Sequence, residues 1–448
     1  MIKDLPGAML AYDMGTGKSK TVVDAICNID DIQVALIVCP KSVMAVWPRE
    51  FSRHASVPVA IYVLETGQSV DKKVEIAKQG ILLSQARKQK VVLVINYDSA
   101  RIPAFQHFSL NRAWDLVVAD ESHRAKSHNS KTSRYMGELG LVAKRRVCLT
   151  GTPMPHSPLD VFGQYRFLSP DTFGRWWTHF KNRYARMGGF QRDGRPVQIV
   201  GINHEDELNE KFYSIAHRVM KRDVIKDLPP VTHETVDIDL SPTARKHYAE
   251  LETQFVTEVR QQLVTVQHAL TKLLRLQQAT SGFLVPDEGE DPIEIHSSKK
   301  EALKEILEDL TDQPVVVFCR FKYDIRQIKD VCDSCKRPVM ELSGSANELA
   351  DWQQTKKSDG AVIVVQIQAG GVGIDLTHSS YSIYYSLGFS LGDYEQSLAR
   401  IDRPGQKEPV TYFHLIAKKT VDERVYGALR KRKRVVESIL DEMRLRNG

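Results

Sequence analysis

Several features that mark specialised classes of protein are scarce in this chain. The 448 residues contain no apolar run near the roughly 20 residues of a membrane-spanning helix, and the opening MIKDLPGAML is too short and too interrupted for a signal peptide. Internal repeats and low-complexity tracts are missing as well. These absences argue against export, membrane insertion and a mainly disordered chain, and they favour a cytoplasmic protein.

Cysteine is also scarce. Six cysteines are too few for a disulfide scaffold, which fits a reducing compartment. Cys39, Cys148 and Cys319 lie in apolar runs, where a free cysteine behaves as a small apolar residue. Cys332 and Cys335 form a CxxC pair, but a structural zinc site usually needs four ligands and no second pair is present. We therefore expect no zinc site.

The net charge is small. The 62 Lys and Arg against 56 Asp and Glu leave a formal charge of +6, which allows a polyanionic partner without requiring one. Hydrophobic residues make up 42% and charged residues 26%, as in ordinary globular proteins. The length fits about two to four domains.

Short apolar runs alternate with helical stretches in the first and last parts of the chain. The runs are continuous, which predicts parallel strands covered on both faces and an α/β fold with doubly wound sheets. The first part contains Ala35–Cys39, Val91–Asn96, Leu116–Ala119 and Arg146–Leu149. The last part contains Val315–Cys319, Ala361–Gln366, Ser382–Ser386 and Thr411–Ile416.

The middle of the chain differs from both ends. Residues 171–228 mix aromatic with basic residues, residues 241–282 read as helix, and residues 287–292 (DEGEDP) read as a linker. Residues 421–446 predict a charged last helix. We therefore expect a first lobe over 1–170, a mixed and helical insertion with its linker over 171–296, a second lobe over 297–420, and a basic C-terminal helix over 421–448.

A phosphate-binding loop follows the first apolar segment, in AYDMGTGKS (11–19). Gly15 and Gly17 allow backbone N–H groups to wrap phosphates. Lys18 supplies a cation and Ser19 a hydroxyl for magnesium. Tyr12 stands where the strict pattern has its first glycine.

Two adjacent carboxylates end another apolar run. Asp120 and Glu121 directly follow Leu116–Ala119, which places them at the carboxyl edge of a parallel sheet, where the phosphate loop also lies. One carboxylate can hold magnesium through water, and the other can orient and deprotonate the attacking water. The two features together predict a nucleotide hydrolase that uses a phosphate loop.

These and further motifs resemble, in order, those of superfamily-two helicase ATPases, specifically the Swi/Snf-related DNA translocases. The resemblance covers essentially the whole chain, and the compact form is similar to bacterial or phage members. Its first part consists of AYDMGTGKS (motif I), LIVCPKSVMAVWPREF at 36–51 (motif Ia), VADESH (motif II), LTGTPMPHSPLDVFGQYRFLSP at 149–170 (motif III and beyond) and HRVMKRDVIKDLPP at 217–230. Its second part consists of VVVFCRF at 315–321, QAGGVGIDLT at 368–377 and QSLARIDRPGQ at 396–406, which resemble motifs IV, V and VI.

The resemblance implies two RecA-like lobes that hydrolyse magnesium-ATP between them, a helical insertion and a C-terminal brace helix. It assigns Lys18 to the β- and γ-phosphates, Ser19 and Asp120 to magnesium, and Glu121 to the general base. Arg400 and Arg403 are expected as arginine fingers, because a guanidinium neutralises the charge that phosphoryl transfer spreads over the oxygens. Nucleotide contacts are expected from Gly15, Thr16, Gly17, Lys18, Ser19, Lys20, Gly373, Asp375 and Gln396, and coupling to DNA from Thr150, Gly151 and Thr152.

The same resemblance implies that the protein binds the backbone phosphates of DNA independently of the base sequence. The expected DNA contacts are Lys41, Ser42, Trp47, Arg320, Ser343, Gly344, Ser345 and Gly371. A cluster with Arg175, Lys181, Arg183 and Arg186, interleaved with Trp176, Trp177 and Tyr184, either lines the duplex or consists of core aromatics and surface cations.

The sequence departs from the family pattern in places. The upstream segment that recognises adenine is missing, so we expect a late start or a fragment. Gln366 and Ile367 stand where motif V opens with Ser or Thr, Asp402 neighbours Arg403 in motif VI, and Phe389 replaces a usual Trp.

The predicted function is ATP-dependent translocation on double-stranded DNA. We expect a monomer in the cytoplasm of a bacterial cell or a phage-infected host, with unidentified protein partners allowed. A strand-separating DNA or RNA helicase is one alternative. A non-catalytic, ATP-responsive DNA-binding protein or truncated remnant is the other.

Overall fold

The computed structural model describes residues 1–155, 157–192, 195–224, 228–260, 266–285, 291–367 and 374–431. The chain divides into two compact units, Met1–Lys226 and Asp227–Gly448. Each unit has its own parallel sheet and its own apolar core, which confirms the predicted pair of α/β lobes. The four segment boundaries proposed from the sequence stay a prediction.

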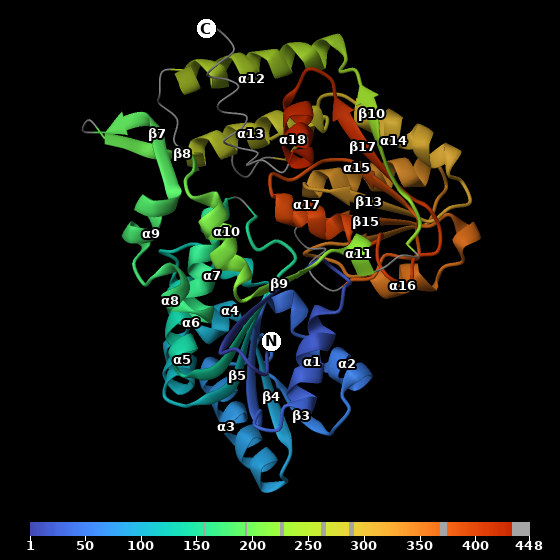
Figure 1. The fold of residues 1–448 in the computed structure, drawn as a ribbon. Helices are drawn as coiled ribbons and strands as arrows, with labels where there is room; N and C mark the ends of the chain where they lie inside the picture. The colour runs from blue at the N-terminus through green and yellow to red at the C-terminus, as the bar shows by residue number, and fades with distance from the viewer. Residues whose placement is uncertain are drawn as a thin grey trace. The chain divides into compact units, whose positions relative to one another are not determined.

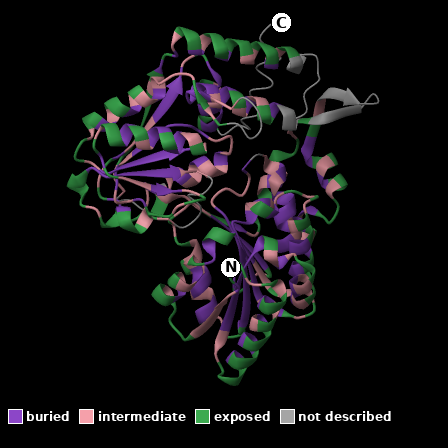
Figure 2. Ribbon diagram, turned by 180° about the vertical axis from the view of Figure 1, so that it is seen from behind, coloured by how far each residue is buried: buried purple, intermediate pink, exposed green. Residues whose placement is uncertain are grey.

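The sheet of the first unit has seven strands in the spatial order β3-β4-β2-β5-β6-β1-β9, and every pairing is parallel (Figure 1). Its central strands are buried on both faces, which explains their continuous apolar sequences (Figure 2). The strands are β1 (Gly7–Tyr12), β2 (Val34–Cys39), β3 (Val59–Val63), β4 (Lys90–Asn96), β5 (Trp114–Asp120), β6 (Ala143–Leu149) and β9 (Ala216–Val219).

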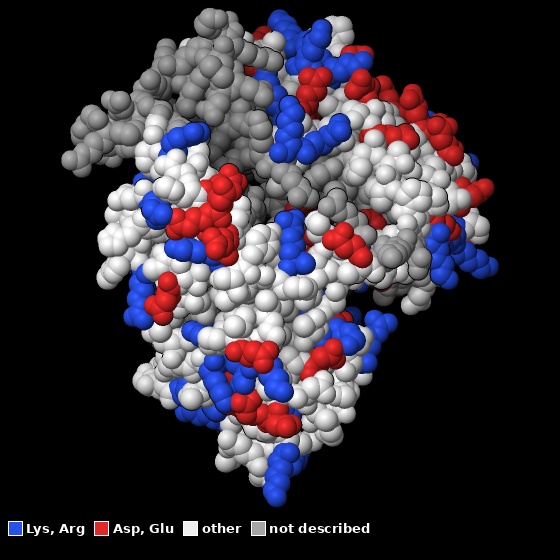
Figure 3. Space-filling model, in the orientation of Figure 1, with Lys and Arg blue, Asp and Glu red and all other residues white. Residues whose placement is uncertain are grey.

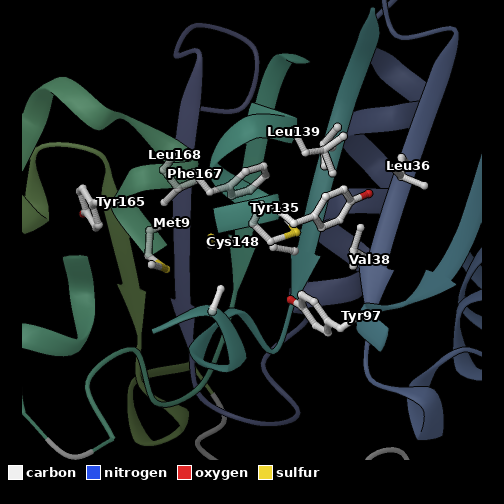
Figure 4. Packing of buried hydrophobic residues seen from close by; sticks show 14 of the residues in the cluster. Met9, Leu36, Val38, Tyr97, Tyr135, Leu139, Cys148, Tyr165, Phe167 and Leu168 are labelled. Carbon is white, nitrogen blue, oxygen red and sulfur yellow. The ribbon is translucent and has the colours of Figure 1, made fainter. Parts of the chain in front are cut away.

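Helices cover both faces of this sheet. On one face, Met9, Leu36 and Val38 of the strands pack with Tyr135 and Phe167 of α6 and α7 (Figure 4). Helices α1 and α2 lie on the opposite face (Figure 1). The helices are α1 (Lys18–Asn28), α2 (Val46–His54), α3 (Val70–Ala86), α4 (Tyr97–Ala100), α5 (Pro103–Leu110), α6 (Lys131–Leu141), α7 (Val161–Leu168), α8 (Pro170–Phe173), α9 (Trp177–Tyr184), α10 (Glu205–Tyr213) and α11 (Lys221–Val224), with 3-10 turns η1 (Lys41–Val43), η2 (Ser122–Ala125) and η3 (Pro158–Asp160).

The sheet of the second unit has six strands in the order β10-β17-β16-β13-β15-β14, again all parallel. Val316 and Phe318 face one apolar cluster and Val315 and Val317 face another, so this sheet is covered on both sides as well. The strands are β10 (Val231–Ile238), β13 (Val315–Cys319), β14 (Val339–Leu342), β15 (Val362–Gln366), β16 (Tyr381–Tyr384) and β17 (Val410–Ala417). The helices are α12 (Pro242–Arg260), α13 (Val266–Thr280), α14 (Ser298–Asp309), α15 (Lys322–Ser334), α16 (Leu349–Gln354), α17 (Leu391–Leu398) and α18 (Val421–Arg430), with the turn η4 (Lys357–Asp359).

The middle of the chain contains strands that the sequence did not reveal. The strands β7 (Ala185–Arg192) and β8 (Arg195–Ile202) pair in antiparallel fashion, and β9 joins the first sheet as an edge strand. A second, short antiparallel pair consists of β11 (Phe283–Leu284) and β12 (Ile293–Glu294). The predicted helix over 241–282 is two helices, α12 and α13, and most of the predicted linker and of the last helix lies outside the described residues.

Within the described ranges, no helix is both long and apolar enough to cross a membrane. The face drawn in Figure 3 carries Lys and Arg interspersed with Asp and Glu, as the small net charge suggests.

Candidate active site

The phosphate loop lies between β1 and α1 of the first unit. Gly15 and Gly17 both have positive φ, 77° and 91°, and Gly17 is the N-cap of α1. Such left-handed residues turn successive backbone N–H groups toward one side, where an anion can be held. The Lys18 ammonium donates to the carbonyl oxygens of Tyr12, at 2.7 Å, and Asp13, at 3.1 Å. The loop is therefore already folded around its lysine.

The loop is also bound to β9, which comes some 200 residues later in the chain. Asp13 N donates to the Val219 carbonyl at 2.9 Å, and Asp13 Oδ2 accepts from Lys221 N at 3.0 Å. The Tyr12 hydroxyl lies 3.1 Å from His217 Nδ1. These supporting contacts were missed by sequence analysis, because β9 is short and polar and gives no periodic signal.

The acidic pair lies at the carboxyl end of β5. Asp120 is the last residue of the strand, and Glu121 has the left-handed φ of 50° that turns the chain into η2. Burial first, and then the neighbouring Glu121 carboxylate, raise the pKa of Asp120, whereas the Lys18 charge lowers it. Because burial disfavours the charged form of Asp120, a cation bound beside it would stabilise that form. Asp120 therefore fits the magnesium role.

Glu121 belongs to a chain of polar groups that reaches the segment after β6. Its buried Oε2 atom lies 3.4 Å from His123 Nδ1 and makes no hydrogen bond to the described residues. His123 Nδ1 lies 3.2 Å from the hydroxyl of the fully buried Thr150, which also accepts from Thr152 N. An unsatisfied buried carboxylate oxygen is a strong acceptor for a water proton, which suits a general base.

The segment Thr150–Thr152 adjoins the phosphate loop. Thr150 N donates to the carbonyl of Leu10 at 3.2 Å. A Cβ added to Gly151 would lie 3.9 Å from Lys18 Nζ and 3.5 Å from the Tyr12 oxygen. Motif III thus lies at the same edge of the first sheet as the phosphate loop and the acidic pair, the two features that the sequence analysis placed together.

One expected DNA contact is wrong. Trp47 is only 1% exposed, and its indole N–H donates to Asp120 Oδ2 at 3.2 Å. The ring packs inward beside Phe51 and positions the acidic pair, so it has no surface to offer a nucleic acid. Lys41 and Ser42, in η1 directly after β2, are exposed and stay candidates.

Two nucleotide candidates of the first unit have local roles. Thr16 donates to the Asp13 carbonyl at 2.7 Å and so braces the loop. Lys20 pairs with Asp24 one helical turn later, at 2.5 Å on an exposed face of α1.

Arg320 is held at the end of β13 in the second unit. Its Nη1 atom donates to Gln277 Oε1 at 3.1 Å, and its guanidinium carbon lies 4.3 Å from the centre of the Phe389 ring. Burial lowers the pKa of Arg320 to about 10, against the opposing charges of Asp324 and Asp393, so it is still a cation at neutral pH.

The loop after β14 is the second group of expected DNA contacts. The Ser343 and Ser345 hydroxyls lie 2.9 Å apart, and Gly344 and Ser345 are exposed. Gly371, expected beside them, and Gly373, expected at the nucleotide, lie outside the described residues.

The expected arginine fingers adjoin the described end of motif V. Leu376 N donates to the Arg400 carbonyl, and Arg403 Nη1 donates to the Ile374 carbonyl, both at 3.1 Å. Asp375 is exposed and its Oδ1 atom accepts from the Thr377 hydroxyl at 2.7 Å, while Gln396 is half-buried on α17.

The described residues contain no group of three or more His, Cys, Asp and Glu side chains that could hold a metal by themselves. Cys332 is buried and Cys335 is half-buried, and both are free thiols. Magnesium held by one carboxylate, one hydroxyl and nucleotide oxygens needs no such group. The Lys18 charge acts on Asp120, so this carboxylate lies near the phosphate loop that carries Ser19, and the donor types of Ser19 and Asp120 fit magnesium.

Comparison with known families gives two consecutive matches. Residues 3–282 match the SNF2-related domain, and residues 298–405 match the helicase conserved C-terminal domain.

Similar proteins occur in eukaryotes and in a phage. The chain is 25% identical to the DNA annealing helicase and endonuclease ZRANB3 of Homo sapiens, over 97% of this chain and 39% of that protein. It is 23% identical to the CHD3-type chromatin-remodeling factor PICKLE of Arabidopsis thaliana, over 96% of this chain and 32% of that protein. Protein p41 of Acyrthosiphon pisum secondary endosymbiont phage 1 is 24% identical, over 96% of this chain and 93% of p41. The chain thus spans well under half the length of the two eukaryotic relatives.

Among solved structures, the Sulfolobus solfataricus SWI2/SNF2 ATPase core in complex with dsDNA matches with a TM-score of 0.43 and 22% identity. That match covers 98% of this chain and 90% of the other.

Proposed function

The chain belongs to the SNF2-related family, and from that premise we propose that it is an ATP-dependent translocase on double-stranded DNA. The names of its relatives support DNA as the substrate, since they include a DNA annealing helicase and a chromatin-remodeling factor. The matching helicase C-terminal domain supports the second ATPase lobe.

The observation that carries the proposal is the meeting of three motifs at one edge of the first sheet. Lys18 lowers the pKa of Asp120, Glu121 contacts His123, and Thr150 contacts both His123 and β1. This is the set that phosphoryl transfer requires: a cation for the phosphates, a carboxylate for magnesium and a base for water.

In this proposal Lys18 exchanges the carbonyls of Tyr12 and Asp13 for the β- and γ-phosphate oxygens of ATP. Ser19 and Asp120 hold magnesium, which neutralises phosphate charge when it is bound. Glu121 orients the attacking water and accepts its proton. Gly15, Thr16, Gly17 and Lys20 complete the nucleotide contacts of the first unit.

The second unit supplies the arginine fingers of the proposal. Arg400 and Arg403 neutralise the charge of the transferring phosphoryl group, and we assign Gly373, Asp375 and Gln396 to the nucleotide contacts of this unit. Because the lysine and the arginines belong to different lobes, hydrolysis in this proposal depends on both lobes.

The proposed DNA contacts are cations, hydroxyls and backbone N–H groups, which suit phosphates. Lys41 and Ser42 serve the first lobe, and Arg320, Ser343, Gly344, Ser345 and Gly371 serve the second. His123 links the general base to Thr150, so Thr150, Gly151 and Thr152 are suited to report the nucleotide state to these contacts. We place the protein, as a monomer with unidentified partners allowed, in the cytoplasm of a bacterial cell or phage-infected host.

The test is a pair of assays on the purified chain. ATP hydrolysis should rise with linear duplex DNA, and a third strand bound in the major groove should be displaced in the presence of ATP. Lys18→Ala should abolish both, whereas Lys78→Ala, which changes an exposed lysine on α3, should change neither. Hydrolysis that ignores duplex DNA contradicts a translocase, and separation of a tailed duplex without displacement of the third strand favours a helicase.

A further inference from the structure

An exposed tryptophan lies at the junction of α8 and α9. Trp176 is 71% exposed, which is the largest exposed fraction among the Phe, Trp and Tyr side chains of the described residues. Gly174, with a φ of 79°, ends α8, and Arg175 and Trp176 form the two-residue elbow before α9 begins (Figure 1). Phe173 of α8 and Phe180 and Tyr184 of α9 are buried, whereas the ring of Trp176 in the elbow faces outward.

The residues that flank the elbow pack in a cluster of aromatic side chains. Phe180, 1% exposed, lies 5.4 Å from Phe173 on one side of the elbow and 5.6 Å from Trp177 on the other, between ring centres. Trp177 also stacks on His128 at 4.0 Å with nearly parallel planes. These contacts anchor the residues on both sides of Trp176, so the elbow that carries it is held in place.

The charges around the elbow are mainly positive. Arg175 is exposed and only loosely paired, 3.7 Å from Asp171. Burial, followed by the charges of Arg166 and Lys181, lowers the pKa of His128 beneath Trp177. Arg183 differs, because its guanidinium is bound by Glu207. The sequence analysis left two interpretations of the basic and aromatic cluster between residues 175 and 186. Trp177, Tyr184 and Arg183 are engaged in packing or ion pairs within the first unit. Trp176, Arg175 and Lys181 can still contact a ligand.

We propose that Trp176 stacks on an unpaired base of DNA while Arg175 contacts the adjacent phosphate. A flat apolar ring next to cations fits a nucleobase with its phosphate, because every base has a π-face and every nucleotide carries a negative charge. An apolar protein surface would offer these cations no opposite charge. The proposal rests on DNA being the substrate, as argued above.

The consequence is recognition of the junction between duplex and single strand. Bases inside a duplex are stacked on one another and offer no free face, whereas bases in a tail or bubble do. The protein is therefore expected to bind tailed duplexes more tightly than blunt ones of equal charge, through a contact that is separate from the phosphate grip.

Intrinsic fluorescence reads this contact directly. Trp47, Trp114 and Trp352 are fully buried, and Trp177 is half-buried under His128, so Trp176 is the tryptophan that faces solvent. Oligothymidine should quench the emission of the full chain, and Trp176→Phe should remove the quenchable part. Quenching that is unchanged in Trp176→Phe overturns the proposal.

Affinity measurements complete the test, by anisotropy of labelled oligothymidine, tailed duplex and blunt duplex. Trp176→Ala should weaken binding of the first two about tenfold and leave the blunt duplex unchanged. Trp176→Phe should restore most of the affinity, and Leu82→Ala, which removes an equally exposed apolar side chain from α3, should have no effect.

The outcomes separate this inference from the proposed function. If Trp176→Ala weakens binding of blunt and tailed duplexes equally, Trp176 does not contact unpaired bases and this inference fails. The proposed function is unaffected by that result as long as DNA still stimulates ATP hydrolysis. Equal affinity for oligouridine overturns the assignment to DNA. Failure of every DNA to bind or to stimulate hydrolysis overturns the proposed function itself.

Discussion

Trp47 Nε1 donates a hydrogen bond to Asp120 Oδ2 at 3.2 Å, and this contact joins the helix after β2 to the acidic end of β5. The buried indole stabilises the charged form of Asp120, because a donor to a carboxylate lowers its pKa. Trp47, which lies within motif Ia, thus contacts the acidic pair from within the first unit.

Replacing this tryptophan should affect magnesium more than DNA. Trp47→Phe keeps the apolar ring but removes the N–H, so we expect the magnesium concentration for half-maximal ATP hydrolysis to rise about tenfold. The salt dependence of DNA binding should not change. Trp352→Phe is the matched control, since it removes an indole donor that reaches the Ala361 carbonyl in the second unit. A loss of DNA affinity in Trp47→Phe without a change in magnesium dependence would contradict the positioning role.

Glu121→Gln should separate binding from turnover. The amide keeps the shape of the side chain but cannot accept a proton from water, so ATP hydrolysis should fall by about 10²- to 10⁴-fold. Binding of a fluorescent ATP analogue should persist, because Lys18 and the phosphate loop are untouched. Glu138→Gln, on the exposed side of α6, should behave as the unaltered protein does. If Glu121→Gln hydrolyses ATP at the normal rate, another residue must act as the general base.

The buried pair Lys299–Asp422 should be essential for the second unit. Lys299 Nζ lies 2.7 Å from Asp422 Oδ2, the Thr280 hydroxyl donates to Asp422 Oδ1, and both charged groups are buried. Lys299→Met leaves the carboxylate buried and uncompensated, at a cost of about 3–5 kcal/mol in unfolding free energy. The exposed pair Lys357–Glu408 has the same 2.7 Å separation, and Lys357→Met should cost under about 1 kcal/mol. Urea titration followed by amide hydrogen exchange in β17 measures the unfolding free energy of both variants. Equal losses of unfolding free energy in Lys299→Met and Lys357→Met would contradict the prediction that the cost depends on burial.

His414 should make the second unit sensitive to acid. Its Nδ1 atom faces the Glu234 carbonyl at 3.3 Å, which can only accept, so that nitrogen carries the proton and Nε2 accepts from the Tyr394 hydroxyl at 2.9 Å. Burial lowers the pKa of His414 from 6.5 to about 3.

The sign of the effect follows from this lowered pKa. The unfolded chain binds the proton more readily, so the contribution of His414 to stability is complete above pH 6.5 and is lost as the pH falls toward 3. The unfolding free energy should drop by up to about 4 kcal/mol over that range. His414→Phe should flatten the profile, and His247→Gln on the exposed surface of α12 should not. Parallel profiles for His414→Phe and the unaltered chain would exclude His414 as the cause.

The sequence predicted the strands whose residues are buried on both faces, because those read as unbroken apolar runs. It missed the four edge strands of the two parallel sheets, β3, β9, β10 and β14. An edge position allows polar residues such as His217 of β9 and Glu234 of β10, which interrupt the apolar pattern. The phosphate loop and the acidic pair follow from local patterns that carry chemistry. The inward position of Trp47 and the contact of Asp13 with Lys221 depend on packing between distant segments, for which a single sequence offers no signal. The roles of the site residues stay predictions.

The position of β1 in the first sheet has a consequence for biosynthesis. Met9 is paired on one side with Cys148 of β6 and on the other with Ala216 of β9. Cys148 follows Met9 by 139 residues and Ala216 follows it by 207, so during synthesis β1 gains its second neighbour only after β9 has emerged from the ribosome. Such distant pairings make folding slow and leave apolar segments exposed to aggregation in the interval. The phosphate loop, which directly follows β1, is thus synthesised long before its contacts with the segment around β9 can form.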